Sequence, residues 1–254
     1  MISDLAEAFT RSVEENLEDR VAVSFSGGLD STLIAHVAKK TAEVHLFSAG
    51  TESCEDLQFA DKVAGRLFLP IKKKVLIEED ILALYAKCYE IVPSNLLKVE
   101  LLIPVYAVAQ LAKEDGIEAI LFGSAAEELF VGYERYYSYH EEGLDLDKIL
   151  REEFKTLKDR DISATKKLCN KLGLEARFPF YSQRLAELAF SIPLEERMAE
   201  RELKKGVLRE AGKLLGAPEI ALQRKKRAMQ YGSGIHKILL RHSVEINKNF
   251  PPKF

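Results

Sequence analysis

The sequence predicts an α/β protein with a doubly wound parallel sheet, and three observations lead to this fold class. Short strand-like segments alternate with segments of helical periodicity through the first half of the chain. The first of them, 21–25, is apolar throughout, as expected for a strand that is buried on both faces. A glycine-rich turn follows it and opens a helix, at the end of the strand where such sheets bind ligands.

The elements can be assigned in order from their periodicity. An amphipathic helix opens the chain, because Leu5, Phe9, Val13 and Leu17 repeat at helical spacing. The predicted strands are 21–25, 44–48, 73–77 and 119–122, and the predicted helices between them are 30–40, 56–67, 79–89 and 100–115. The strand signal stops after about residue 124, and the polar, aromatic segment 133–147 is predicted to be a mobile or surface segment. Further helices are predicted near 146–157, 162–172, 183–190, 203–215 and 235–247. We therefore expect one domain over 1–254, with an α/β nucleotide-binding core at about 18–124 and a helical part at about 125–254 that completes the site.

Composition excludes several classes of protein. The chain has 254 residues, of which 47% are hydrophobic, enough for a substantial core. A net charge of −3 provides no general attraction to nucleic acid or to an anionic membrane. No apolar run reaches the roughly 18 residues of a membrane span, and the N-terminus has no signal-peptide pattern, so we expect a cytoplasmic protein. The 30% of charged residues, with few Asn and Gln and no Trp, indicates a thermophilic source.

Cysteines and histidines do not form a recognisable metal or disulfide pattern. Cys54, Cys88 and Cys169 are odd in number and far apart, which indicates reduced thiols. The five histidines form no cluster of zinc-ligand spacing. A sulfur-transfer role for Cys54 would require an exposed thiol with a lowered pKa; the alternative is an inert small residue.

The turn Ser26-Gly27-Gly28-Leu29-Asp30-Ser31 has the properties of a polyphosphate site. Two adjacent glycines let the backbone approach a ligand closely, and the helix that follows offers unpaired N–H groups and a positive dipole end. Ser26, Ser31 and Thr32 add hydroxyl groups, and Asp30 adds a carboxylate that could hold Mg²⁺. The turn lacks the lysine of a Walker loop and the glycine spacing of a dinucleotide-binding fingerprint. The alternative is a glycine-rich turn that binds nothing.

The hexapeptide resembles the pyrophosphate loop of the N-type ATP pyrophosphatases, which cut ATP between its α and β phosphates, adenylate a substrate and release pyrophosphate. Further segments make the chain similar to the synthetase domain of asparagine synthetases. They are 47–50 with the acids at 55 and 56, the stretch 121–133, the stretch 174–180, and 205–209 together with 224–226. Their order and spacing agree with that family over about residues 20–235.

The chain departs from the family pattern at several positions. Ser124 stands where the family has an acid implicated in handling the nucleophile, and Ala125 replaces a glycine. Glu127 replaces the magnesium-binding aspartate, and Ser182, after Tyr181, replaces another aspartate. The family's glutaminase domain and its terminal cysteine have no counterpart in this sequence. We therefore expect ammonia to arrive free or from a separate glutaminase subunit.

The resemblance implies ATP and Mg²⁺ as cofactors and assigns roles to individual residues. The residues implied to bind ATP or pyrophosphate are Ser24, Ser26, Gly27, Gly28, Asp30, Ser31, Phe47, Ser48, Gly123 and Lys205. The implied catalytic residues are Lys226, Glu127 and Glu175, the implied substrate-binding residues are Ser124 and Arg177, and the implied metal ligands are Asp30 and Glu127.

Each assignment has a structural alternative. Asp30 and Glu127 could be charges that stabilise helix N-termini. Lys226 lies in a basic run that could be solvated or could face tRNA. Glu175 and Arg177 could form a buried pair that holds the turn at Pro179.

One further pair of basic residues leaves two readings open. Lys205 and Arg209 are four residues apart, on one helix face, and could reach phosphate or pair with acids.

The function predicted from these segments is that of an ATP-dependent ligase. It would adenylate an aspartate-like carboxylate, release pyrophosphate and form an amide with ammonia or another amine, using small-molecule substrates and neither membrane nor nucleic acid; a homodimer is compatible with the sequence. One alternative is a tRNA-modifying pyrophosphatase, against which the acidic balance and the lack of Cys-x-x-Cys argue. A second is an ATP-binding paralogue that lost its chemistry with the change at Ser124. Some members of the family close rings, and the segments do not distinguish those substrates.

Overall fold

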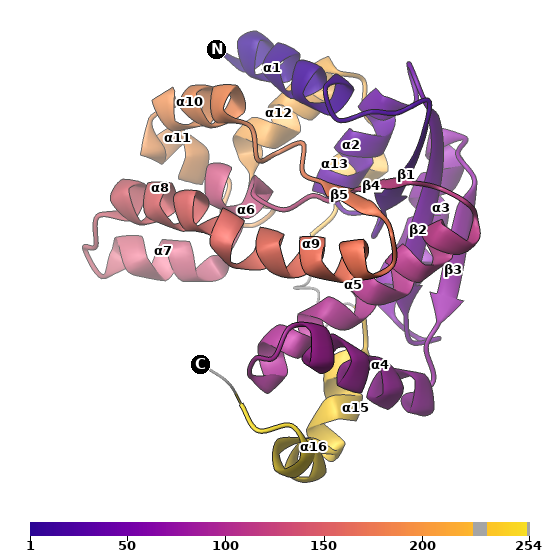
Figure 1. Cartoon of the computed structure of the whole chain (residues 1–254). Coiled ribbons are helices and arrows are strands. Elements are labelled where there is room, and N and C mark those ends of the chain that lie inside the picture. The colour runs from indigo at the N-terminus through magenta and orange to yellow at the C-terminus, as the bar shows by residue number, and fades with distance from the viewer. Residues whose placement is uncertain (226–232, 253–254) are drawn as a thin grey trace.

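A single parallel sheet organises the part of the chain that the structure describes. The computed structural model describes residues 1–225 and 233–252. Within them the strands are β1 (Arg20–Ser24), β2 (Glu43–Gly50), β3 (Ile71–Val75), β4 (Ala119–Leu121) and β5 (Glu175–Arg177). They pair in the order β3-β2-β1-β4-β5, and every pairing is parallel (Figure 1). The predicted doubly wound sheet is confirmed, and its strand order reverses between β1 and β4, where ligands bind in such folds.

Helices cover both faces of this sheet. On one face α2 (Leu29–Ala38) contacts β1 and β2, and α3 (Glu55–Leu67) contacts β2 and β3. On the other face α5 (Leu96–Glu114) contacts β1, β2 and β3, while α9 (Asp161–Lys171) contacts β5 and α5. The helix α4 (Glu78–Ile91) packs against α5, and α1 (Ile2–Glu14) packs against α2. β1 is buried because helices cover both faces of the sheet, which explains its apolar composition, whereas the edge strand β3 is largely exposed.

The second half of the chain is mainly helical and lies beside the sheet (Figure 1). Its remaining helices are α6 (Ala126–Leu129), α7 (Glu134–Glu141), α8 (Leu146–Thr156), the 3₁₀ turn η1 (Leu157–Asp159), α10 (Gln183–Ser191), α11 (Leu194–Met198), α12 (Gly206–Leu214), α13 (Glu219–Leu222), α15 (Ile235–Arg241) and α16 (Ser243–Asn249). The helices α10 and α12 pack against α1, whereas α15 packs against α4 at the opposite end of the molecule (Figure 1). The second half of the chain therefore packs against elements of the first half at both ends of the molecule.

Two sequence predictions about this half were wrong. β5 was missed because it has three residues, two of them charged, and no apolar run to mark it. The segment 133–147 contains the helix α7, and its Tyr136 and Tyr137 are buried with Val131, Leu146 and Leu150 in a small second core. The tyrosines of α7 stand among charged and polar residues, which concealed a helix whose buried side packs on α8.

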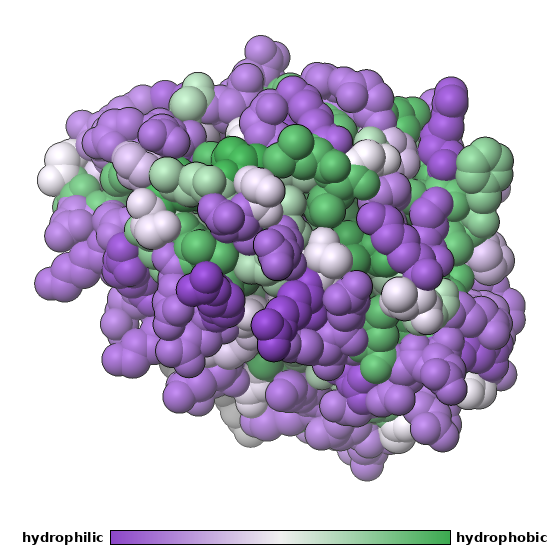
Figure 2. Space-filling model, turned by 90° about the horizontal axis from the view of Figure 1, so that it is seen from above, coloured by the Kyte–Doolittle hydropathy of each residue, from purple (hydrophilic) through white to green (hydrophobic). Residues whose placement is uncertain are grey.

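The main core joins the sheet to the helical half. Its buried residues come from β1, β2 and β4 and from helices of both halves, and the ring of Phe9 on α1 stacks on Phe180 with centroids 4.7 Å apart. Figure 2 shows the molecule from above, relative to Figure 1. The surface on this side is mostly hydrophilic, with a band of hydrophobic side chains between hydrophilic ones. In the described residues no single helix has both the length and the hydropathy to cross a membrane; α4 and α5 meet these requirements only as a pair bent by 107°.

Candidate active site

The turn between β1 and α2 is shaped by its neighbours before any ligand binds. Gly27 has a φ of 66°, and a Cβ there would lie 3.1 Å from the Cα of Ala60 and from the carbonyl oxygen of Phe59 in α3. Glycine is therefore required both by the backbone conformation and by the close approach of α3.

Serine hydroxyls brace the same turn. The backbone N–H of Gly28 donates to Ser26 Oγ at 3.3 Å, and the N–H of Ser26 donates to Ser31 Oγ at 3.4 Å. Ser31 Oγ in turn donates to the carbonyl oxygen of Gly28 at 3.3 Å. Beyond it, the first N–H groups of α2 have no partner inside the helix, and together with the helix dipole they favour an anion. Hydrogen bonds of its own hydroxyl groups therefore fix the conformation of the turn, next to N–H groups of the kind that favour an anion.

Two of the implied metal ligands converge on one ammonium group. Lys205 Nζ lies 2.9 and 2.8 Å from the two carboxylate oxygens of Asp30 and 2.9 Å from Glu127 Oε1. The lysine side chain is only 8% exposed, against 20% for Asp30 and 30% for Glu127. Burial lowers the pKa of Lys205, but the attraction of Asp30 and then of Glu127 outweighs it, so its pKa lies above the usual value and the group is charged.

Backbone features bring Glu127 to this point. Gly123 follows β4, and a Cβ on it would lie 3.0 Å from the Cβ of Asp30, so the loop after β4 is in contact with the first turn of α2. Ala125 then adopts a φ of 81° before α6 begins, at a position where glycine would be free of strain. At Gly132 a Cβ would lie 1.6 Å from Glu127 Oε2 and 2.4 Å from Lys205 Cε. Glu127 and Lys205 therefore fill the space that the missing side chain leaves.

Arg209 holds the segment that carries Lys205. Its guanidinium donates to the carbonyl oxygens of Leu203, Lys204, Leu222 and Arg224, at 2.7 Å for Lys204 and 3.1 Å for Arg224. Lys204 and Lys205 both have left-handed backbone conformations, with φ of 58° and 56°. In this structure Lys205 pairs with acids, whereas Arg209 matches neither interpretation of the sequence, because its partners are backbone carbonyl groups.

Arg224 is a site residue to which the sequence analysis gave no role. It donates to the carbonyl oxygen of Ser26 at 2.6 Å and to Asp56 Oδ1 at 2.7 Å, and its guanidinium lies 4.0 Å from the ring centroid of Phe59. The side chains of Arg224 and Asp56 are 7% and 8% exposed, so this is a buried ion pair. In the sequence only the Arg-Lys-Lys segment 224–226 indicated this residue, and the family resemblance assigned a role there to Lys226 alone. Lys226 itself lies outside the described residues.

Phe47 and Ser48 lie buried on β2, next to β1 in the sheet. The N–H of Phe25 donates to the carbonyl oxygen of Phe47 at 2.7 Å, which connects this strand to the start of the turn. Ser24 ends β1 and is half-buried. These three implied nucleotide-binding residues therefore lie on the neighbouring strands β1 and β2.

The three cysteines lack the features of a reactive thiol. All are buried, and burial raises the pKa of Cys54 and raises the pKa of Cys88 and of Cys169 to about 12. Cys54 has a structural role, because its sulfur accepts a hydrogen bond from the N–H of Leu57 at the start of α3. The condition stated for sulfur transfer, an exposed thiol with a lowered pKa, is not met.

Glu175 and Arg177 form an ion pair with each other. Arg177 donates to Glu175 at 2.7 Å, to the carbonyl oxygens of Asn16 and Leu17 after α1, and to Glu18. The hydrogen bond from Arg177 lowers the pKa of Glu175, whose side chain is 64% exposed, so the pair is not the buried one considered above. The contacts described for these two residues do not include Asp30, Glu127 or Lys205.

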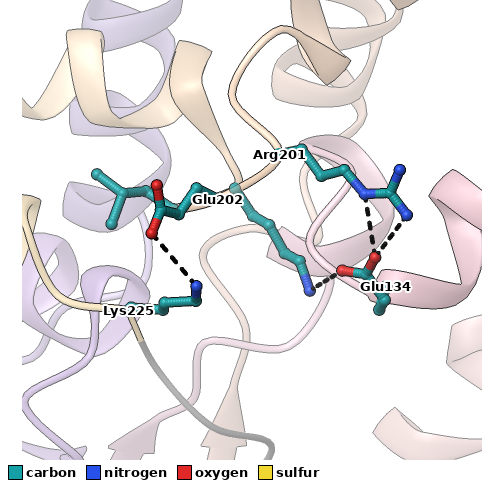
Figure 3. A pocket seen from close by; sticks show the side chains of 6 residues that line it. Glu134, Arg201, Glu202 and Lys225 are labelled. Carbon is teal, nitrogen blue, oxygen red and sulfur yellow. Dashed lines mark hydrogen bonds and ion pairs between the residues drawn. The ribbon is translucent and has the colours of Figure 1, made fainter.

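A shallow pocket of about 400 Å³ lies on the chain segments that flank this centre. Charged residues line most of it, and Figure 3 shows Glu134 facing Arg201 and Glu202 facing Lys225. Glu134 contacts Arg201 at 2.9 Å and Lys204 at 2.8 Å, while Lys225 lies 3.4 Å from Glu202. These cations are already paired with acids, so the pocket provides no unpaired positive charge for an anion among its described lining residues.

Ser124, which stands where the family has an acid, is half-buried in the turn between β4 and α6.

Comparison with known proteins identifies the family. The model of the asparagine synthase family matches residues 4–144 and 138–247 of the chain. The chain belongs to the asparagine synthase family. It is 33% identical over 259 aligned positions to the putative glutamine-hydrolyzing asparagine synthetase 1 of Methanocaldococcus jannaschii, covering 87% of this chain and 47% of that protein. It is 25% identical over 252 positions to the glutamine-hydrolyzing asparagine synthetase B of Escherichia coli, covering 92% of this chain and 45% of that protein.

The family member described here spans about half the length of these relatives. Among solved structures, the ammonia-dependent NAD synthetase of Campylobacter jejuni matches with a TM-score of 0.38 and 16% identity, over 67% of this chain and 91% of the other.

Proposed function

We propose that this member of the asparagine synthase family is an ATP-dependent ligase that adenylates a small carboxylate and joins it to ammonia or another amine. The acyl substrate would be aspartate-like, and the amine would arrive free or from a separate glutaminase. The proposal rests mainly on one observation, the meeting of the phosphate-type turn with Asp30, Glu127 and Lys205 at the carboxyl edge of the sheet. Family membership supports the same reaction class.

The residues present fit a bound Mg²⁺. In the described residues there is no cluster of three or more His, Cys, Asp or Glu side chains that would hold a metal alone. Mg²⁺ in nucleotide sites, however, usually takes one or two carboxylates together with phosphate oxygens and water. Asp30 and Glu127 approach the same ammonium group from two elements, so both carboxylates are oriented towards one cation. Bound there with ATP, Mg²⁺ would neutralise charge on the phosphates.

The other tasks of the reaction would fall to groups of the chain itself. Cleavage between the α and β phosphates leaves negative charge on pyrophosphate, and a preorganised site stabilises that charge without reorganising. We expect the N–H groups at the start of α2 and the ammonium of Lys205 to stabilise this charge. Arg224 would keep the turn and α3 in position, since it binds both Ser26 and Asp56. Ser124 and Arg177 remain candidates for contacting the acyl substrate, and Lys226 and Glu175 remain candidates for catalysis.

ATP–pyrophosphate exchange tests the proposal. Purified protein is incubated with ATP, Mg²⁺, labelled pyrophosphate and one carboxylate at a time, aspartate included. We expect label to enter ATP only when an accepted carboxylate is present. Asp30→Asn should slow exchange by about 10²–10³-fold, in the range measured when one group that stabilises transition-state charge is removed. Asp61→Asn is the matched control, because Asp61 pairs with Lys73 at the surface.

The outcomes separate this proposal from its competitors. If no carboxylate supports exchange, the ligase is refuted. ATP binding without exchange would then favour a non-catalytic paralogue, whereas salt-sensitive tRNA binding would favour a tRNA-modifying enzyme. With an active carboxylate in hand, Glu175→Gln and Ser124→Ala in the same assay test the roles that the family resemblance implies for them.

A further inference from the structure

The ammonium of Lys205 lies between the two carboxylates that the family resemblance implies as metal ligands. Its Nζ lies within 2.9 Å of oxygens of both Asp30 and Glu127, and its side chain is 8% exposed. The carboxylates and the ammonium carry a combined charge of −1, so the cluster is largely neutralised before any ligand arrives. The same two carboxylates cannot hold a divalent ion at that point while the ammonium is there.

The backbone around Lys205 fixes the ammonium in this position. The missing side chain of Gly132 accommodates the lysine stem, and Arg209 holds the preceding carbonyl groups. The neighbouring Lys204 is directed elsewhere, to Glu134 at 2.8 Å. A bare metal ion would have to displace a buried ammonium and leave it without a partner, which is costly. A nucleotide arriving with the metal would offer that ammonium new anionic partners in its phosphate oxygens.

We propose that Lys205 is an exchangeable counter-cation that excludes free divalent metal from Asp30 and Glu127 and admits the metal only together with the nucleotide. Lys205 would thereby set the order in which the metal and the nucleotide bind. The proposal rests on the proposed function, because it assigns the two carboxylates to the metal of a metal–ATP complex.

Metal binding without turnover tests the proposal. Mn²⁺, which is paramagnetic, is titrated into the protein and free Mn²⁺ is measured by electron paramagnetic resonance, with and without α,β-methylene-ATP, which cannot be cut between its α and β phosphates. We expect wild-type protein to bind Mn²⁺ at least about tenfold more tightly with the analogue than without it. Lys205→Met should bind free Mn²⁺ at least about tenfold more tightly than wild type, because a positive charge next to both carboxylates is gone. The same variant should bind the analogue more weakly.

Lys204→Met is the matched control, since it removes the same charge from the adjacent left-handed residue without touching Asp30 or Glu127. It should behave as wild type in both titrations. A purely structural role for Lys205 would weaken both affinities together, so the opposite changes are diagnostic. Circular dichroism establishes that each variant is folded, and Lys205→Gln replaces Lys205→Met if the latter is not.

Two results would overturn the proposal: free Mn²⁺ affinity that does not rise in a folded Lys205 variant, or wild-type protein that binds Mn²⁺ equally well with and without the analogue. The second needs no variant. Because neither titration involves a carboxylate substrate or turnover, failure here is distinguishable from failure of the ligase assignment in the exchange assay.

Discussion

Replacing Gly132 by alanine should damage the centre of the site through a steric effect alone. The new Cβ would lie 1.6 Å from Glu127 Oε2 and 2.4 Å from Lys205 Cε, so the carboxylate must move by well over an ångström. Overpacking of this kind costs about 1–3 kcal/mol, and separating a partly buried ion pair adds to it. We expect Gly132→Ala to lower the free energy of unfolding by about 2–4 kcal/mol.

Urea denaturation followed by circular dichroism measures this change, and pyrophosphate exchange measures its effect on activity. Gly65→Ala is the control, because Gly65 lies inside α3 with no atom within 4 Å of the added Cβ. Alanine there should raise stability by about 0.5–1 kcal/mol through its helix propensity. If Gly132→Ala unfolds at the wild-type urea concentration and retains wild-type exchange, Glu127 and Lys205 are not packed as described, and the reasoning is refuted.

Two further predictions concern charge in the interior. Arg224→Met should lower the free energy of unfolding by about 3–5 kcal/mol, because it leaves the carboxylate of Asp56 buried without its partner. The side chain of Lys225 is 68% exposed, so Lys225→Met should change the free energy of unfolding by less than about 0.5 kcal/mol. Equal urea midpoints for the two variants would contradict the buried pair. Burial lowers the pKa of His36, whose Nε2 lies 2.9 Å from the carbonyl oxygen of Leu215 and whose buried Nδ1 has no partner within the described part of the chain. The unfolded chain therefore binds a proton at His36 more readily than the folded chain does, and wild-type stability should fall as the pH drops through the ordinary histidine range. His36→Gln should lack this part of the pH dependence. If thermal melts of the two proteins show the same pH dependence, His36 is not its source.

Periodicity predicted most of the elements because each one carries its own signal. The buried strand β1, the glycine turn and the stripe of α3 are recognisable from neighbouring residues alone. β5 is not, since its three residues become a strand only by pairing with β4. The prediction for α7 failed for a related reason. Tyr136 and Tyr137 serve as core residues only because α8 covers them, and the local sequence does not show this contact.

The residues of the candidate site also differ in whether the local sequence reveals them. Asp30 could be singled out because it belongs to a contiguous motif whose residue types all suit a polyphosphate ligand. Arg224 was passed over because its partners, Ser26 and Asp56, are far away in the chain and nothing local indicates a buried pair. The spacing of Lys205 and Arg209 left their roles open, because one helix face is compatible with either phosphates or acids.

The sequence by itself determined the class of sheet, the phosphate-type turn and membership of a family, since all three are written in local patterns and their order along the chain. Only the tertiary structure decided that Lys205 stands between Asp30 and Glu127 and that Arg209 serves the backbone. It also decided that the cysteines are buried. The physical reason is that charge pairing and burial depend on distances across the fold, which the packing of the helical half against the sheet sets.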